Sequence, residues 1–168
     1  YHDSAPFDTA SNGREILRFV EQKQVTLGEV FLNPTKIYCD PVVDLIKLAQ
    51  SPESNFSVND IHGICHVTGG GLSNLLRLHK SLGWEIDNPL PVHPEFKWLA
   101  NTGGVDTWEM YRTFNMGCGM ILAVDSQHAV AITEWLTEKM TGVHIIGQVT
   151  NNGHKVVHLG AEVEFTHY

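Results

Sequence analysis

Apolar positions along the chain recur at two different spacings, and the two alternate from one stretch to the next. Spacings of three and four predict helices after Gly13, from Pro41 to about Ser51, after Gly71, at 94–101, at 106–114 and after Ser126. Short apolar runs predict strands at 61–67, 118–124, 143–149 and 155–160. Helices and strands therefore interleave along the whole chain.

Polar residues mark the expected ends of several of these elements. Asn12 with Glu15 resembles a capping box before the first helix. Asp40 is an N-cap type, and Pro41 suits the first helical position. Asp125-Ser126 is expected to cap the last helix, and the polar stretch 51–60 is expected to be a surface connection.

The pair Asn152-Gly153 separates the last two expected strands and predicts a β-hairpin between them. A hairpin beside strand–helix units favours a mixed β-sheet over a purely parallel one. We expect an α/β (α+β) layered fold, with a mixed sheet covered by helices. No composition shift or repeat divides the chain, so residues 1–168 are expected to form a single domain.

Composition narrows the class of protein and its partners. Hydrophobic residues make up 42% and charged residues 18% of the 168, as in a soluble globular domain. The net charge of −8 argues against nucleic acid and anionic membrane as partners, and no run of apolar residues is long enough to span a membrane. Three widely spaced cysteines favour a reducing cytoplasm. The chain begins Tyr1-His2-Asp3, and we expect it to be a piece of a longer protein.

Glycines supply the sharpest local feature, the run Thr68-Gly69-Gly70-Gly71 between an expected strand and an expected helix. Backbone N–H groups at such a junction suit an anion, and phosphate is the natural guest. A tight strand-to-helix turn without a ligand is an equally good interpretation. For Gly117-Cys118-Gly119, close backbone packing at the start of a strand is favoured.

His62, Cys65 and His66 lie close together and raise the possibility of a metal site or a thiol nucleophile. On a strand, the two histidines share a face and Cys65 points the opposite way. No paired ligand set follows in the sequence, so we expect no metal site and a cysteine that belongs to the core.

Three segments together resemble one family. They are Asn33–Tyr38 (NPTKIY), His66–Leu72 (HVTGGGL) and Glu109–Met120 (EMYRTFNMGCGM). Their order and spacing are similar to the second half of aminoimidazole ribonucleotide synthetase, also called phosphoribosylformylglycinamidine cyclo-ligase. The resemblance extends from about Ser11 to Val149.

The resemblance implies an enzyme of purine biosynthesis that closes formylglycinamidine ribonucleotide to aminoimidazole ribonucleotide with ATP and Mg²⁺. Phosphoryl transfer to the formyl oxygen makes it a good leaving group, and an amidine nitrogen then closes the ring. In this family, an N-terminal domain carries most metal ligands, most nucleotide contacts and the main dimer interface. The chain would be the C-terminal domain of a homodimeric protein, and the isolated domain would be inactive.

Site residues follow from the same resemblance. Thr68, Gly69, Gly70 and Gly71 would hold the ribonucleotide 5′-phosphate, and Ser11, Asn12 and Gly13 match a Ser-Asn-Gly turn of the family. Ala10 stands where the family commonly has a histidine with a suspected active-site role. His66 would then be the catalytic group that replaces it, or the protein no longer catalyses the reaction.

Other functions remain open at this point. Formylglycinamidine synthetase, thiamine-monophosphate kinase, selenide water dikinase and the hydrogenase-maturation dehydratase share the architecture. The segments Asn33–Tyr38 and Glu109–Met120 favour the cyclo-ligase over these relatives. A stand-alone, non-catalytic module that binds a nucleotide or phosphate at the glycine loop is the alternative from a different functional class.

Overall fold

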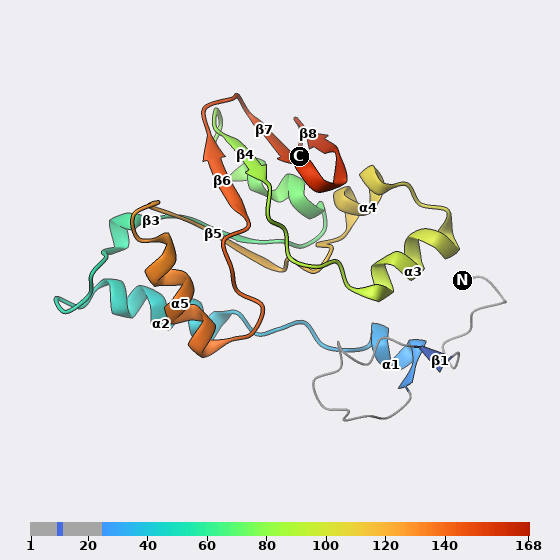
Figure 1. Ribbon diagram of the computed structural model, residues 1–168, viewed down its shortest axis with the longest axis horizontal. Helices are drawn as coiled ribbons and strands as arrows, with labels where there is room; N and C mark the ends of the chain where they lie inside the picture. The colour runs from blue at the N-terminus through green and yellow to red at the C-terminus, as the bar shows by residue number, and fades with distance from the viewer. Residues whose placement is uncertain (1–9, 12–24) are drawn as a thin grey trace.

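The computed structural model describes residues 10–11 and 25–168, and Figure 1 shows the arrangement. Three sheets and their helices form a layered α+β fold, as the sequence predicts. The elements in chain order are β1 (Ala10–Ser11), β2 (Val25–Thr26), α1 (Leu27–Phe31), α2 (Cys39–Ala49), a 3₁₀ turn (Val58–Asp60), β3 (Ile61–His66), a 3₁₀ helix (Gly71–Arg77), β4 (Gly83–Ile86), α3 (Pro94–Gly103), α4 (Thr107–Thr113), β5 (Met120–Val124), α5 (Ala129–Lys139), β6 (Gly147–Thr150), β7 (Lys155–His158), a 3₁₀ turn (Leu159–Ala161) and β8 (Val163–Phe165).

A four-stranded mixed sheet in the order β6-β4-β7-β8 lies at the top of the view in Figure 1. Strand β4 pairs antiparallel with β6 and parallel with β7, and β7 pairs antiparallel with β8. The side chains of Val156 and Phe165 are buried in the main core, which α4 and the 3₁₀ helix also cover. Both predictions, a mixed sheet and helices over it, are confirmed.

The second sheet is a two-stranded antiparallel ribbon of β3 and β5. Ile121 and Ala123 on one face of β5 belong to the main core. Leu122 and Val124 on the other face pack with a second core, built by α2 and α5 around Leu45. The ribbon therefore separates two hydrophobic cores, because successive side chains of a strand point to opposite faces.

The predicted hairpin at Asn152-Gly153 is wrong. The chain does reverse direction there, but β4 lies between β6 and β7 and pairs with both. Trp84 and Ile86 of β4 are buried, which makes this strand the better partner for each neighbour. An Asn-Gly pair indicates a local reversal of the chain. It does not indicate whether another strand lies between the two strands that it connects.

Two predicted helix caps are also displaced. Helix α2 begins at Cys39, with Tyr38 as its N-cap residue and no side-chain cap bond, so Asp40 lies inside the first turn. Helix α5 begins at Ala129, and the Asp125 carboxylate instead accepts a hydrogen bond from the Gln127 amide in the preceding turn. Both helices lie where apolar spacing predicts them. Neither begins at the residue that the predicted capping side chain indicates.

The remaining predicted elements have mixed outcomes. Strands β3 and β5 and helices α3 and α4 are confirmed, and Asp106 caps α4 by accepting a bond from the Glu109 amide. The helix expected after the glycines is a seven-residue 3₁₀ helix instead of an α-helix. The helix expected after Gly13, with its capping box, lies outside the described residues. Within the described ranges, no helix is long and apolar enough to cross a bilayer.

Candidate functional site

The three segments that carry the family resemblance converge at the adjoining ends of β3 and β5. His66 pairs with Met120 in the strand register, and the amide of Val67 donates to the Gly119 carbonyl over 2.9 Å. Tyr38 packs against both strands from the loop before α2. Residues separated by tens of positions in the sequence therefore form one site.

His66 projects from the end of β3 and its side chain is exposed. Its ring meets the Tyr38 ring edge-on, with 5.8 Å between centroids and 61° between planes. The Tyr38 hydroxyl lies against Gly119, where a Cβ atom would overlap it. A glycine is thus required at position 119 if Tyr38 is to stand beside His66.

Two buried side chains, neither of which the sequence argument singled out, shape the glycine loop. The Asn74 side-chain amide donates to the carbonyls of Gly69, at 3.2 Å, and Gly71, at 2.6 Å. The Ser73 hydroxyl donates to the Gly70 carbonyl at 2.6 Å. All three loop carbonyls are therefore turned toward the protein.

The amide groups of the loop point in the other direction. Because the N–H and C=O groups of a trans peptide are antiparallel, the Gly70 N–H points away from Asn74. It donates to no group in the described part of the chain, whereas the Gly71 N–H is taken by the Thr68 carbonyl at 2.9 Å. The loop can offer Gly69 and Gly70 amides to an anion, but the short 3₁₀ helix behind it adds no α-helix dipole.

Position 71 has room for glycine only. Its φ is +52°, and a Cβ atom there would overlap the Tyr111 carbonyl oxygen and lie 2.8 Å from that of Phe114. Gly69 is different, because a Cβ atom on it would meet nothing within 4 Å. The loop is therefore anchored at Gly71 and open at Gly69.

Arg77 supplies positive charge beside the loop. Its guanidinium donates to the Asn74 side-chain oxygen, and it lies over the Tyr168 ring at 4.6 Å from the centroid. Tyr168 also approaches Gly70, with its ring 3.1 Å from where a Cβ atom would stand. Arg77 thus holds Asn74, which holds the loop carbonyls.

The cysteines near the site are poorly suited to nucleophilic chemistry. Burial, with a smaller contribution from Cys65, raises the pKa of the Cys118 thiol to about 12. Burial also raises the pKa of Cys65, and the neighbouring Arg77 opposes this only in part. Both thiols are protonated near neutral pH, and thiolates are the reactive form.

The remaining expectations about local chemistry are settled by burial and geometry. Cys65 is buried and His62 and His66 are exposed, so they lie on opposite faces of β3 as predicted. Gly117-Cys118-Gly119 forms a tight turn, in which the Asn115 side chain accepts from the Gly117 amide at 3.0 Å. Close packing at a strand start is confirmed there. The described residues include no group of three His, Cys, Asp or Glu side chains able to hold a metal.

Only the first residue of the Ser-Asn-Gly turn belongs to the described residues. Ser11 pairs through its backbone with Val25 in the small sheet β1-β2. Asn12 and Gly13 lie outside the described residues. Of the candidate site residues, the structure therefore brings together His66, Thr68 and the three glycines that follow.

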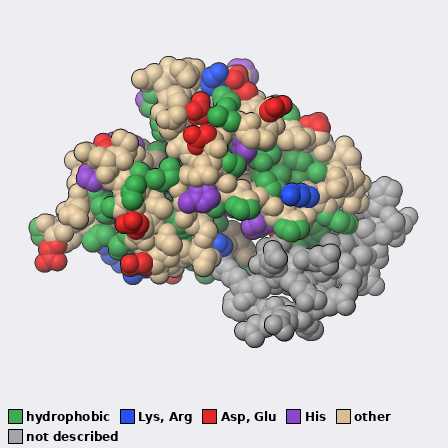
Figure 2. All heavy atoms as spheres, in the orientation of Figure 1, with side chains coloured by type: hydrophobic (Ala, Val, Ile, Leu, Met, Phe, Trp, Pro, Cys, Tyr) green, Lys and Arg blue, Asp and Glu red, His purple; other side chains and the backbone are tan. Residues whose placement is uncertain are grey.

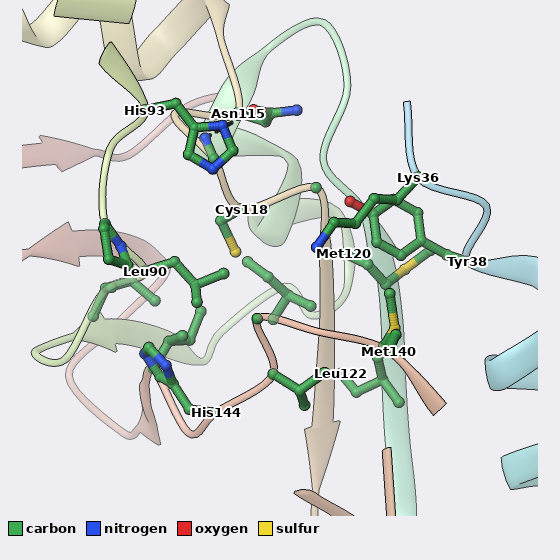
Figure 3. A pocket seen from close by; sticks show the side chains of 18 of the residues that line it. Lys36, Tyr38, Leu90, His93, Asn115, Cys118, Met120, Leu122, Met140 and His144 are labelled. Atoms are coloured by element: carbon green, nitrogen blue, oxygen red, sulfur yellow. Dashed lines mark hydrogen bonds between the residues drawn. The ribbon is translucent and has the colours of Figure 1, made fainter. Parts of the chain in front are cut away.

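A groove of about 1290 Å³ opens beside the same site, and Figure 3 looks into it. Met120 and Leu122 of β5 lie on one side, with Lys36 and Tyr38 next to them. Leu90, His93 and His144 lie across from β5 (Figure 3). Figure 2 shows hydrophobic side chains reaching the surface over both α5 and α3 on this face of the molecule. Sequence patterns alone could not reveal the groove, because its walls come from distant elements.

Comparison with known proteins gives a consistent result. The family described as "AIR synthase related protein, C-terminal domain" matches residues 8–160. The chain is 35% identical over 162 residues to a phosphoribosylformylglycinamidine cyclo-ligase of Methanosarcina mazei, which covers 96% of this chain and 39% of that protein. Proteins of the same name from Methanopyrus kandleri and Methanobrevibacter smithii are 36% and 39% identical, over 83% and 76% of this chain and 37% and 34% of their own lengths.

The chain spans less than two fifths of the length of these curated relatives. The family match over residues 8–160 includes all three converging segments of this chain. Sequence identity above 30% and a family match over most of the chain agree with the resemblance found from those segments. The chain therefore belongs to the family of AIR synthase related proteins, as their C-terminal domain.

Proposed function

We propose that the chain is the C-terminal domain of an ATP-dependent cyclo-ligase that converts formylglycinamidine ribonucleotide to aminoimidazole ribonucleotide. The observation that carries the proposal is the convergence of Tyr38, His66, the glycine loop and Gly119 at one place. The cyclo-ligase name of the relatives supports the same reaction.

In this proposal the glycine loop binds the 5′-phosphate of the ribonucleotide. The outward amides of Gly69 and Gly70 donate to phosphate oxygens, while Asn74 and Ser73 keep the carbonyls away from them. Arg77 adds positive charge close by and stabilises the same geometry through Asn74. Thr68 is exposed and immediately precedes the three glycines.

His66 moves a proton during ring closure in this proposal. It is exposed and lies two residues before the loop, and histidine is the side chain that enzymes use most often for general acid–base catalysis. Tyr38 restricts the orientation of the imidazole through the edge-on ring contact. The proposal gives His66 the role of the family histidine whose position Ala10 occupies.

ATP supplies the phosphoryl group that converts the formyl oxygen into a leaving group. The described residues include no group of three His, Cys, Asp or Glu side chains able to hold a metal. The proposal assigns the metal and most of the nucleotide contacts to the N-terminal half of the longer protein. We further propose that the longer protein is a homodimer and works in the cytoplasm.

Ala10 favours one second candidate, a protein that binds the ribonucleotide through the loop without turning it over. Such a protein would keep the glycine loop, Asn74 and Arg77, because these residues serve binding alone. It would have no use for a proton-transfer group at His66. The two candidates therefore differ in what a substitution at His66 does.

The experiment compares His66→Asn with His62→Asn in the longer protein. Both histidines are exposed on β3, and only His66 lies at the site. His66→Asn is expected to lower kcat roughly 100-fold or more and remove a limb of the pH profile, whereas His62→Asn changes little. An active wild type whose kcat and pH profile survive His66→Asn would exclude the proton-transfer role. An inactive wild type that still binds the ribonucleotide would favour the second candidate.

The phosphate site has its own test, with a control at a second glycine of positive φ. Gly70→Val is expected to remove the phosphate-dependent shifts of the loop amides in NMR spectra. Gly104 also has a positive φ, +61° against +99° for Gly70, but it ends α3 in open space. Gly104→Val should therefore leave the phosphate shifts intact. Equal behaviour of the two variants would contradict a phosphate site at the loop.

A further inference from the structure

Tyr168, in the segment that follows β8, returns to the glycine loop. Its ring lies 3.1 Å from the place where a Cβ atom on Gly70 would stand. The other atoms near that place belong to the Asn74 amide and the Ser73 hydroxyl, which hold the loop carbonyls. Tyr168 therefore lies on the side of the loop where its supporting side chains lie. The family match ends at residue 160, so this contact comes from outside the matched part of the chain.

Two interactions join Arg77 to Tyr168. The guanidinium carbon lies over the ring at 4.6 Å from its centroid, and Nη1 donates to the phenol oxygen at 3.4 Å. Arginine stacks well on aromatic faces, because its guanidinium is planar and weakly hydrated. Arg77 is exposed, and a long exposed side chain otherwise populates many rotamers. The Tyr168 ring therefore restricts the orientation of Arg77.

The same guanidinium determines how the Asn74 carboxamide is oriented. Its Nη2 donates to the Asn74 side-chain oxygen, and its Nε donates to the Asn74 backbone carbonyl at 3.5 Å. Asn74 is completely buried, so its side-chain oxygen needs a donor from the protein. With that oxygen turned to Arg77, the nitrogen of the same planar group faces the carbonyls of Gly69 and Gly71. A series of contacts therefore runs from Tyr168 through Arg77 and Asn74 to the loop.

Tyr168 contributes little to the hydrophobic cores, which distinguishes its contact with Arg77 from ordinary packing. It is 58% exposed, and neither of the two cores built by the described residues includes it. Removal of the ring should therefore change the free energy of unfolding only slightly. A change in the behaviour of the loop without Tyr168 would then result from the lost orientation of Arg77, because the protein would still be folded.

We propose that Tyr168 is a positioning residue for the glycine loop, which acts through Arg77 and Asn74 and makes the loop bind a phosphate group more tightly. The loop amides face a phosphate only while the loop carbonyls are held in the opposite direction. A loop that already has this geometry loses less conformational entropy when the anion binds. The inference rests on the proposed function in taking phosphate as the ligand, and it assigns no contact between Tyr168 and that ligand.

Phosphate binding by the longer protein tests the proposal and requires no turnover. Inorganic phosphate is added to protein with isotope-labelled glycine and asparagine, and the NMR shifts of the Gly69 and Gly70 amides give the dissociation constant. Tyr168→Ala is expected to raise this constant about 5-fold, the size of an exposed cation–π contact. Tyr168→Phe keeps the ring and should raise it less than about 2-fold. The control His167→Ala changes the exposed neighbouring residue and should leave phosphate binding unchanged.

A double substitution shows whether Tyr168 acts through Arg77. In protein that already carries Arg77→Ala, the addition of Tyr168→Ala should change the dissociation constant for phosphate by less than about 1.5-fold, because the contact that it removes is already lost. Effects of the two substitutions that multiply would show that Tyr168 reaches the loop by another route and would overturn the proposal. Unchanged phosphate binding in Tyr168→Ala alone would overturn it as well.

Asn74 provides a readout that is independent of the ligand. Its side-chain amide hydrogens should exchange with solvent at least about 10-fold faster in Tyr168→Ala than in wild type, and at the wild-type rate in His167→Ala. Equal exchange in all three proteins would overturn the proposal even where phosphate binds. Exchange that depends on Tyr168 in a protein that binds no phosphate would support the series of contacts and overturn only the phosphate site of the proposed function.

Discussion

The four-stranded sheet and the β3–β5 ribbon differ in how well the described residues cover their outer strands β8 and β5. In the larger sheet, α4 covers the outer strand β8, where the Trp108 indole donates to the Glu164 carbonyl at 3.1 Å. The side chains of Val156 and Phe165 are almost fully buried. The ribbon has cores on both faces, yet one edge of β5 faces an open groove.

This difference separates what the chain does alone from what it does within a longer protein. A two-stranded ribbon is marginal by itself and gains stability from what packs on it. The larger sheet contacts the 3₁₀ helix through β7 and thereby supports the glycine loop. The ribbon carries His66 at its end, so the least complete region of the structure positions the candidate catalytic group.

Gly71, at the junction of the two sheets, should be the position most sensitive to substitution. The 3₁₀ helix contacts both β3 and β7, and it begins at Gly71. Gly71→Ala places a Cβ atom on the Tyr111 carbonyl at a positive φ and should lower the free energy of unfolding by about 4 kcal/mol or more. Urea denaturation measures the loss. The control Gly69→Ala, in open space, should change stability by less than about 0.5 kcal/mol. Similar losses for the two would show that the loop is not anchored at Gly71.

Truncations of single core side chains should distinguish the two sheets directly. Phe165→Ala in β8 removes a side chain that is 2% exposed and should cost about 3–5 kcal/mol of unfolding free energy. Leu122→Ala in β5 removes a partly exposed side chain at the groove and should cost about 2 kcal/mol or less in the 168-residue chain. A loss for Leu122→Ala as large as that for Phe165→Ala would show that the two sheets are equally well packed.

A smaller effect, confined to the larger sheet, is expected from pH. Burial lowers the pKa of His158 below its ordinary 6.5, and its ring nitrogen accepts from the Ala161 amide at 3.0 Å. The unfolded chain then binds more protons than the folded chain as pH falls below 6.5, so stability decreases with acidification until the folded pKa is passed. His158→Asn keeps an acceptor but does not titrate, and it should lose this part of the pH dependence. Identical pH profiles for variant and wild type, from denaturation at pH 7.5 to 5.5, would contradict the assignment.

Local patterns predicted most of the elements, and long-range pairing accounts for the main error. Helical spacing located α2, α3, α4 and α5, and apolar runs located β3 and β5. The insertion of β4 between β6 and β7 depends on contacts more than sixty residues apart, for example Gln148 with Glu85 at 2.9 Å. No turn signal at Asn152-Gly153 contains that information.

The candidate site was predictable where a motif carried it and unpredictable where burial decided it. The resemblance of three segments to the AIR synthase family identified His66 and the glycine loop as candidate site residues. Asn74 and Ser73 look like ordinary polar residues of a helix in the sequence, and only their complete burial reveals that they orient the loop carbonyls. The groove beside β5 also escaped prediction, because its walls come from elements that are distant in the sequence.

Product formation measures the central claim most directly. ATP-dependent conversion of formylglycinamidine ribonucleotide to aminoimidazole ribonucleotide would be followed for the longer protein and for the 168-residue chain at equal concentration. The account predicts product from the longer protein and none from the chain alone, because the metal and nucleotide contacts are assigned to the other half. Turnover by the purified chain, or a folded longer protein that binds the ribonucleotide and ATP and makes no product, would contradict it.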